Sequence, residues 1–305
     1  MGRIRVANAP CSWGVAEGID PRGGSPVYAQ VLDEMAATGY EGTELGDWGF
    51  MPDEPETLRA DLSKRNLAMV GAFVPVALAS PSALSDGLAA AQRAARLLAA
   101  CANSPSSTGA PFVILADSGG ATRLECAGRI GPEHGLSRAQ WRTCAEAVRR
   151  IAQAVRDGTG LRTVFHHHSG TFVETPAEVE TLFDLTPPDL LGLCLDTGHY
   201  AYGGGDPLEA LKRFGRRVWH LHFKDCDEAV AARARAEGWD YLEAVRQGVF
   251  CDLGKGGIDF ASLLAELRSQ GYEGWIVVEN ESPPGAQTPR QKAQRDRDYL
   301  RRLGL

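Results

Sequence analysis

The amino-acid sequence predicts an α/β protein, a (β/α)8 TIM barrel, that spans residues 1–305 as a single domain. Eight short apolar runs alternate with segments of helical character, and 305 residues is a normal length for one such barrel. Nearly continuous apolar runs are typical of parallel strands that are buried on both faces. A doubly wound sheet is the alternative, but no G-x-G-x-x-G segment follows the first run.

The strand predictions rest on runs rich in Val, Ile, Leu and Phe that end in polar residues. The apolar runs that end in His, Asp or Glu lie roughly 30 to 55 residues apart, which is the spacing of successive βα units. We expect eight strands, at residues 4–8, 42–45, 68–74, 112–116, 162–166, 191–196, 218–222 and 275–279.

The helix predictions rest on periodicity and start signals. In the Ala-rich segment 83–102, Leu88, Ala91 and Ala95 recur at helical spacing. Thr175 and Asp206 each precede a proline, the pattern of an N-cap followed by proline at the first helical position. We expect helices near 25–38, 54–65, 83–102, 137–157, 176–185, 206–214, 259–270 and 287–302.

Two long connections interrupt this alternation. Residues 117–136 follow the fourth strand, and residues 225–258, which we expect to be partly helical at 237–247, follow the seventh. Both connections leave the carboxyl ends of strands, so they lie at the rim where barrels carry their active sites and lids.

Composition excludes several classes of partner. The net charge of −7 and the scattered arginines argue against a nucleic-acid surface. No apolar stretch approaches the ~20 residues of a membrane span. A strand-like segment follows the initial Met without a signal peptide, and the seven cysteines form no C-x-x-C pair, which indicates reduced thiols in a cytoplasmic protein. A homo-oligomer is compatible with this composition.

Six of the seven histidines lie between residues 166 and 222, at the ends of apolar runs. His166, Asp196, His222 and Glu279 each end a predicted strand, and parallel strands of a barrel bring such ends to one rim. We therefore expect these four side chains to bind a divalent metal. Mixed nitrogen and oxygen ligands suit Mn²⁺, Co²⁺, Fe²⁺ or Zn²⁺ better than Ca²⁺.

The neighbouring histidines have plainer interpretations. His167 alternates with His166, so it points toward the helices and packs or hydrogen-bonds behind the barrel. His134 is interpreted as a loop residue. His220 shares a face with His222 but lies deeper, where it can orient a ligand. A helix cap or a salt bridge in a loop is the alternative role for Asp196.

The segments D-T-G-H (196–199), H-L-H-F-K-D (220–225) and V-V-E-N (277–280) resemble, in this order, the xylose isomerase-like TIM-barrel superfamily of sugar isomerases, epimerases and dehydratases. Within it the inosose dehydratases are the most similar branch. Further segments, from N-A-P-C-S-W-G (8–14) to G-Y-E-G-W-I-V-V-E (271–279), extend the resemblance over almost the whole chain.

The resemblance implies one divalent ion, Mn or Co rather than Zn or Mg. Asp196, His222 and Glu279 match three of the four metal ligands of the superfamily. The fourth is commonly a Glu at the end of strand five, where this chain has His166. We expect His166 to be the fourth ligand, with Glu174 as the alternative.

The resemblance also assigns a pocket for a small polyol or sugar. His199 matches a substrate-contacting histidine, and Lys224 matches a basic or polar position after strand seven. Trp13 and Glu44 are expected to line the pocket, and Trp48 to stack on the substrate ring.

The activity implied by the resemblance is that of a metal-dependent hydro-lyase of inositol catabolism, which dehydrates a keto-polyol such as 2-keto-myo-inositol through an enediolate. His168 or Glu279 would take the α-proton, and His199 or Lys224 would protonate the departing hydroxyl.

A sugar isomerase or epimerase at the same metal site is the alternative activity. Because an epimerase needs an acid/base group on each face of the substrate, His166 in place of a Glu favours the dehydratase. The acidic net charge disfavours a nuclease of the endonuclease IV type. Ligands on separate strands disfavour a non-catalytic sugar-binding barrel.

Overall fold

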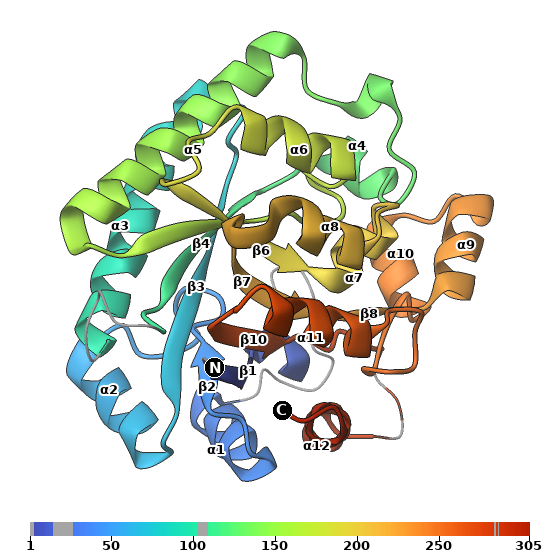
Figure 1. The fold of residues 1–305 in the computed structure, drawn as a ribbon. Coiled ribbons are helices and arrows are strands. Elements are labelled where there is room, and N and C mark those ends of the chain that lie inside the picture. Colours follow the sequence, from blue (N-terminus) through green and yellow to red (C-terminus); the bar gives the residue numbers. More distant parts are fainter. Residues whose placement is uncertain (1–2, 15–26, 103–108, 284, 286) are drawn as a thin grey trace.

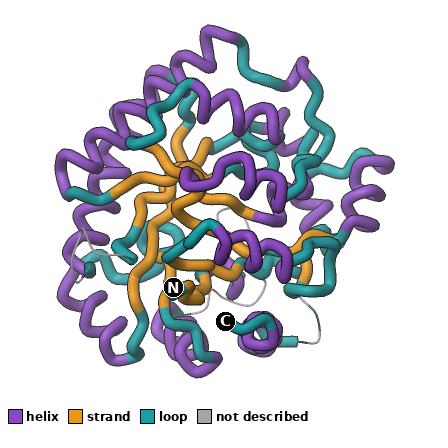
Figure 2. The backbone as a smooth tube through the Cα atoms, in the orientation of Figure 1, coloured by secondary structure: helices purple, strands orange, loops and turns teal. Residues whose placement is uncertain are grey.

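Eight parallel strands close into a barrel in the computed structural model, which describes residues 3–14, 27–102, 109–283, 285 and 287–305. The strand order is β1-β10-β7-β6-β5-β4-β3-β2, so each barrel strand pairs with its neighbours in the chain and β10 closes the ring against β1. The strands lie in the centre and the helices surround them (Figures 1 and 2). The predicted TIM barrel is confirmed.

All eight predicted strands are present, with bounds that differ by at most two residues. The barrel strands are β1 (Ile4–Asn8), β2 (Gly42–Glu44), β3 (Ala68–Val76), β4 (Phe112–Asp117), β5 (Arg162–His166), β6 (Leu191–Asp196), β7 (Val218–Phe223) and β10 (Gly274–Val278). Glu279 therefore follows the last strand directly instead of ending it.

Eight helices correspond to the predicted ones. They are α1 (Tyr28–Thr38), α2 (Pro55–Lys64), α3 (Leu84–Cys101), α5 (Arg138–Thr159), α6 (Pro176–Asp184), α8 (Pro207–Phe214), α11 (Phe260–Ser269) and α12 (Pro289–Arg302). The predicted first helix included residues 25 and 26, which lie outside the described residues. The side chains of Thr175 and Asp206 cap α6 and α8 as expected, each accepting hydrogen bonds from backbone N–H groups of the first turn.

Four further helices lie in connections at the carboxyl ends of the strands. They are α4 (Ala121–Glu125), α7 (Thr197–Tyr202), α9 (Glu228–Glu237) and α10 (Tyr241–Arg246). His199 lies in the short helix α7, which begins directly after β6 because the Asp196 side chain caps its first turn.

The connection 225–258 is more ordered than predicted. It contains α9, α10 and a small antiparallel pair, β8 (Asp225–Cys226) with β9 (Phe250–Cys251). The predicted helical part at 237–247 corresponds to α10, whereas α9 before it was not predicted. The buried Asp225 carboxylate accepts hydrogen bonds from the backbone N–H groups of Cys226, Gly254, Gly256 and Ile258, which holds the two ends of the connection together.

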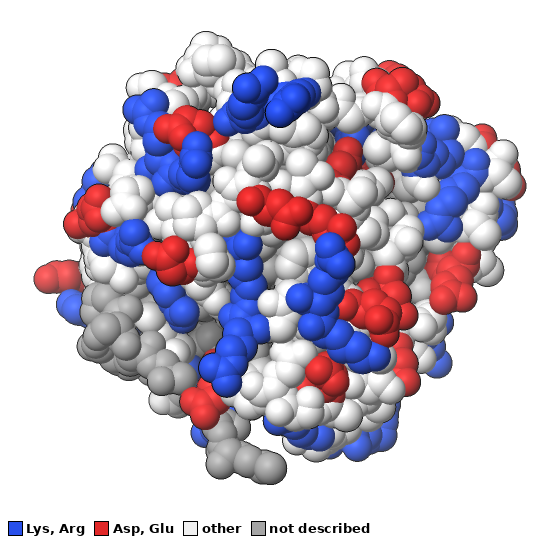
Figure 3. Space-filling view, turned by 45° about the horizontal axis from the view of Figure 1, so that its top comes forward, with Lys and Arg blue, Asp and Glu red and all other residues white. Residues whose placement is uncertain are grey.

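The helices and the surface charges of the structure concern the two partners that the composition disfavours, a membrane and a nucleic acid. Within the described residues, the helices lack the length and apolarity that crossing a membrane requires. Acidic and basic side chains are interspersed over the face shown in Figure 3.

A buried ion pair ties the connection after β4 to helix α6. The Arg123 guanidinium donates to both carboxylate oxygens of Glu178, at 2.8 Å each, and its Nε donates to the carbonyl of Thr171. The Arg123 side chain is 0% exposed, so its charge depends on this carboxylate. The pair therefore fixes the segment that leads from β5 to α6.

Removal of this carboxylate should be costly. We expect Glu178→Gln to lower the free energy of unfolding by about 3–5 kcal/mol, because the Arg123 charge stays buried without its partner. The control is Glu146→Gln, at the exposed pair of Glu146 with Arg149, with an expected loss of about 0–1 kcal/mol. Urea unfolding followed by circular dichroism measures both, and equal losses would contradict the expectation.

Candidate functional site

Four side chains, three from the ends of strands and one from the residue after a strand, converge at the carboxyl end of the barrel. A register shift in the pairing of β6 with β7 places Asp196 directly opposite His222. His166 ends the adjacent β5, and Glu279 continues β10 with its N–H donating to the carbonyl of Phe223 at 3.1 Å. One ligand atom from each of the four residues lies within 4.8 Å of the others. The structure thus brings together the four side chains that were expected to bind a metal.

The side-chain nitrogen and oxygen atoms of this cluster face one another. His222 Nδ1 lies 3.1 Å from Glu279 Oε1 and 3.8 Å from Asp196 Oδ2. His166 Nε2 lies 3.7 Å from the same Asp196 oxygen. All four residues are buried, with at most 8% exposure.

Asp196 has two roles in this arrangement. Its Oδ1 accepts a hydrogen bond from the N–H of His199 at 2.7 Å and caps α7. Its Oδ2 is buried without a hydrogen-bond partner, and so is His222 Nδ1. Unpartnered acceptors of mixed oxygen and nitrogen type, converging in a buried position, fit a divalent cation.

The charges of the cluster also favour a cation. Burial opposes the ionisation of Asp196 and Glu279, but nearby cationic groups, Lys224 for Asp196 and His222 for Glu279, lower the pKa of each carboxyl. Burial disfavours charge on His222, yet Cys194 and the Glu279 and Glu44 carboxylates raise its pKa well above the usual value. The cluster therefore holds two ionised carboxylates, and His222 would release a proton when its Nδ1 binds a metal ion.

Lys224 supplies a fixed positive charge beside the cluster. Its buried Nζ lies 2.6 Å from Glu281 Oε1 and 3.1 Å from Glu279 Oε2. Burial acts against the ammonium form, but these two carboxylates outweigh it and raise the pKa of Lys224 well above its ordinary value. Lys224 is thus a cationic hydrogen-bond donor at neutral pH.

His168 and His199 contact each other beside the cluster, with ring centroids 3.8 Å apart and ring planes tilted by 42°. His168 Nδ1 lies 2.7 Å from the carbonyl oxygen of Ser169, and the Ser169 N–H donates to His199 Nδ1 at 3.4 Å. Burial and the neighbouring His166 lower the pKa of His168 to about 3. Burial and the His168 ring lower that of His199, so both rings are neutral at pH 7.

The residues expected to line a substrate pocket occupy different environments. Trp13 is buried near the site and its indole N–H donates to Glu34 at 2.7 Å. Trp48 is 37% exposed and stacks on the Arg93 guanidinium, 4.2 Å from its ring centroid. The Trp48 ring thus meets α3, and stacking on a substrate stays a prediction.

Glu44 as a pocket residue and Glu174 as the alternative ligand stay predictions, but both carboxylates already accept hydrogen bonds within the protein. The buried Glu44 carboxylate accepts from His220 and His222. These two histidines outweigh burial and lower its pKa to about 2. Glu174 Oε1 and Oε2 accept from the backbone N–H groups of Gly128 and Gly170, at 2.6 Å each, and burial raises its pKa to about 7. This carboxyl group organises two loops.

The remaining histidines support the site or lie outside it. His167 Nε2 accepts a hydrogen bond from the N–H of Asp196 at 3.3 Å, so it fixes the end of β6 from behind the cluster. His220 shares the Glu44 oxygen with His222. His134 accepts from Gly131 in a one-turn 3-10 helix of the connection after β4, as a loop residue does.

Two residues beside the site were missed from sequence. Tyr241, at the start of α10, packs against His168 with ring centroids 5.4 Å apart, and its hydroxyl reaches Glu281 at 3.4 Å. Glu281 follows Glu279 by two residues, so strand alternation could have indicated it. No periodic signal marks Tyr241, because a long connection carries it to the site.

Sequence comparison relates this chain to characterised families. The family model described as xylose isomerase-like TIM barrel matches residues 32–303. An inosose dehydratase of Geobacillus kaustophilus is 34% identical over 98% of this chain and 94% of the relative. An inosose dehydratase of Lacticaseibacillus casei is 30% identical over 97% of this chain and 96% of the relative.

Solved structures share the fold at low sequence identity. The probable 3-DHS dehydratase of petrobactin synthesis from Bacillus anthracis superposes with a TM-score of 0.71 at 15% identity, covering 97% of this chain and 98% of that one. A D-psicose 3-epimerase from Clostridium cellulolyticum gives a TM-score of 0.68 at 16% identity, covering 98% and 99%.

Close packing around Lys224 provides a test of the site geometry. A Cβ at Gly198 would lie 2.7 Å from Lys224 Cγ and 2.9 Å from its Cβ, and the lysine is fully buried. We expect Gly198→Ala to lower the free energy of unfolding by about 1–3 kcal/mol through overpacking. Gly158→Ala is the control, because that Cβ meets nothing within 4 Å in α5 and should cost nothing. Thermal unfolding measures both, and an unchanged Gly198→Ala protein would contradict this packing.

Proposed function

This chain belongs to the xylose isomerase-like TIM barrel family, and on that premise we propose that it is a metal-dependent hydro-lyase that removes water from a keto-polyol such as 2-keto-myo-inositol. The observation that carries the proposal is the buried cluster of His166, Asp196, His222 and Glu279, with its unpartnered oxygen and nitrogen atoms. Full-length similarity to inosose dehydratases supports the reaction and the substrate.

The four residues of the cluster would hold one divalent ion, for which we propose Mn²⁺ or Co²⁺ because the ligands mix imidazole with carboxylate. Such an ion, when bound, supplies a Lewis acid that stabilises negative charge developing on substrate oxygens. We propose that the protein acts in inositol catabolism, in the cytoplasm.

His168 is suited to take the α-proton. A carbonyl oxygen only accepts hydrogen bonds, so the contact with Ser169 places the hydrogen of the neutral ring on Nδ1. Nε2 of His168 then carries the lone pair and can act as the general base. Glu279 is the weaker candidate, since its two oxygens already face His222 and Lys224.

Lys224 is suited to donate a proton to the departing β-hydroxyl, because its ammonium is held in place by Glu279 and Glu281. His199 accepts at Nδ1 from Ser169, so its hydrogen is on Nε2, a buried donor without a partner. That donor can bind a substrate hydroxyl. His168 thus removes the α-proton, the carbon–oxygen bond breaks as the double bond forms, and Lys224 completes the water molecule.

Metal content tests the cluster. After loading with Mn²⁺ or Co²⁺ and dialysis, we expect one ion per chain by elemental analysis, and a large loss of bound metal in Asp196→Ala. Asp206→Ala is the matched control, because Asp206 also caps a helix but lies outside the cluster. Retention of one ion by the Asp196→Ala protein would disprove the proposed centre.

Product analysis tests the reaction. With 2-keto-myo-inositol we expect a product that is lighter by one water molecule and absorbs in the ultraviolet. NMR and mass spectrometry identify this product. Activity should vanish on chelation and return with Mn²⁺ or Co²⁺. An epimer of unchanged mass would establish the sugar epimerase instead, and turnover that persists after complete metal removal would reject the metal-dependent mechanism.

A further inference from the structure

A carboxylate lies directly beneath the metal-ligand cluster and contacts one of its histidines. Glu44 Oε1 is 2.9 Å from His222 Nε2 and 2.8 Å from His220 Nε2. Glu44 is 3% exposed, and both histidines are buried at 1% or less. The pairing of β2 with β3 shifts register between Thr43 and Glu44, the kind of irregularity that redirects a side chain.

The shared oxygen fixes the tautomers of both rings. A carboxylate oxygen accepts hydrogen bonds and donates none, so each Nε2 carries a hydrogen. When His222 gives up its other proton to bind a metal ion, Nδ1 is the nitrogen that carries the lone pair. This is the atom that faces Glu279 and Asp196 at 3.1 and 3.8 Å and has no hydrogen-bond partner.

We propose that Glu44 is a positioning residue that holds His222 in the Nε2–H tautomer and presents its Nδ1 to the metal ion. Carboxylates that accept from the far nitrogen of a metal-bound histidine orient the ring and raise its basicity. This inference rests on the proposed metal centre and extends it to a second layer of residues.

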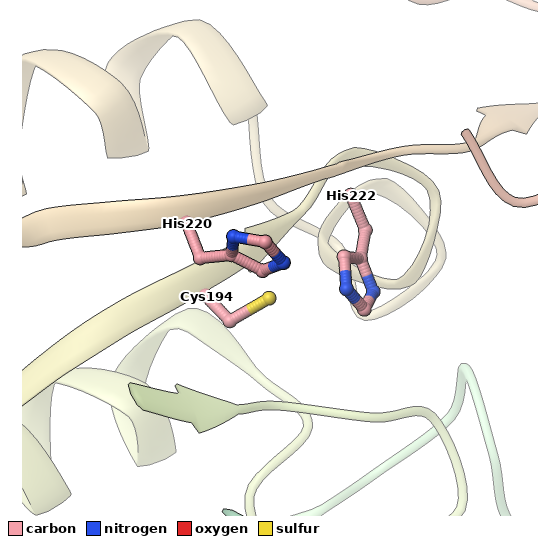
Figure 4. A group of neighbouring side chains, drawn as sticks. All are labelled: Cys194, His220 and His222. Carbon is pink, nitrogen blue, oxygen red and sulfur yellow. The ribbon is translucent and has the colours of Figure 1, made fainter. Parts of the chain in front are cut away.

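His220 is a second hydrogen-bond donor to the same Glu44 oxygen. It lies two residues before His222 on β7, and both rings project to the same side of that strand (Figure 4). Cys194 on the neighbouring β6 pairs in register with His220, and its sulfur lies beside the two rings (Figure 4). His220 thus helps to hold Glu44 against His222, while the Cys194 thiol interacts with the His222 ring in the same layer.

Cys194, His220 and His222 could instead form a metal site of their own. The Cys194 sulfur and one nitrogen from each histidine also lie within 4.8 Å of one another. If these three residues bound an ion of their own, His222 Nε2 would face metal instead of Glu44. The Cys194→Ser variant separates the two arrangements.

Cobalt binding measures the contribution of Glu44. We expect Glu44→Gln to weaken Co²⁺ binding by about 10–100-fold in competition with a chelating dye, and to change the visible absorption of the bound ion. Cys194→Ser should keep the wild-type affinity, spectrum and one ion per chain. Wild-type affinity and spectrum in folded Glu44→Gln would overturn the proposal. Loss of a second ion, or of a sulfur-to-cobalt absorption band, in Cys194→Ser would also overturn it.

Nitrogen-15 NMR of the histidines in the wild-type protein gives an answer even if Glu44→Gln does not fold. With a diamagnetic ion such as Zn²⁺ bound, His222 is expected to carry its hydrogen on Nε2 and to bind the metal through Nδ1; the opposite assignment would reject the role of Glu44.

The Asp196→Ala variant distinguishes a failure of the proposed metal centre from a failure of the positioning role of Glu44. If it binds Co²⁺ normally, the proposed centre fails. If it does not bind and Glu44→Gln is normal, only the positioning role fails.

Discussion

The pairing of β6 with β7 is the constraint on which the site depends. A one-residue register shift after Leu193 sets Cys194 opposite His220 and Asp196 opposite His222. Because side chains alternate along a strand, a slip by one residue would turn the facing side chains to the other side of the sheet. The pairing of β10 with β7 then brings Glu279 beside the same histidine. The cluster is a consequence of strand order and register in four consecutive barrel strands.

Burial of so many charged groups is tolerated because each has a compensating partner. Glu44 accepts from two histidines, Lys224 lies between two carboxylates, and Asp196 caps α7 with the oxygen that does not face the cluster. Buried charges without such partners would cost several kcal/mol each. Asp196 Oδ2 and His222 Nδ1 are among the buried atoms of the described residues that have no hydrogen-bond partner, and they face each other at 3.8 Å.

Connections at the carboxyl end enclose this centre. The ion pair of Arg123 with Glu178 anchors the chain beyond β5, where His168 and its Ser169 contact lie. On the other side, Tyr241 of α10 packs against His168 and reaches toward Glu281. Water exclusion by these segments strengthens the electrostatic interactions inside the site.

The sequence by itself determined the barrel, its eight strands and the four strand-end residues, because apolar periodicity and His, Asp or Glu at run ends are local signals. Only the tertiary structure decided what Glu44, Glu174 and Tyr241 contact. Glu44 looks like a pocket residue in the sequence, yet it lies under His222, which is 178 positions away in the chain. Such contacts depend on register shifts and on connections that fold back over the rim, and no periodic pattern encodes either.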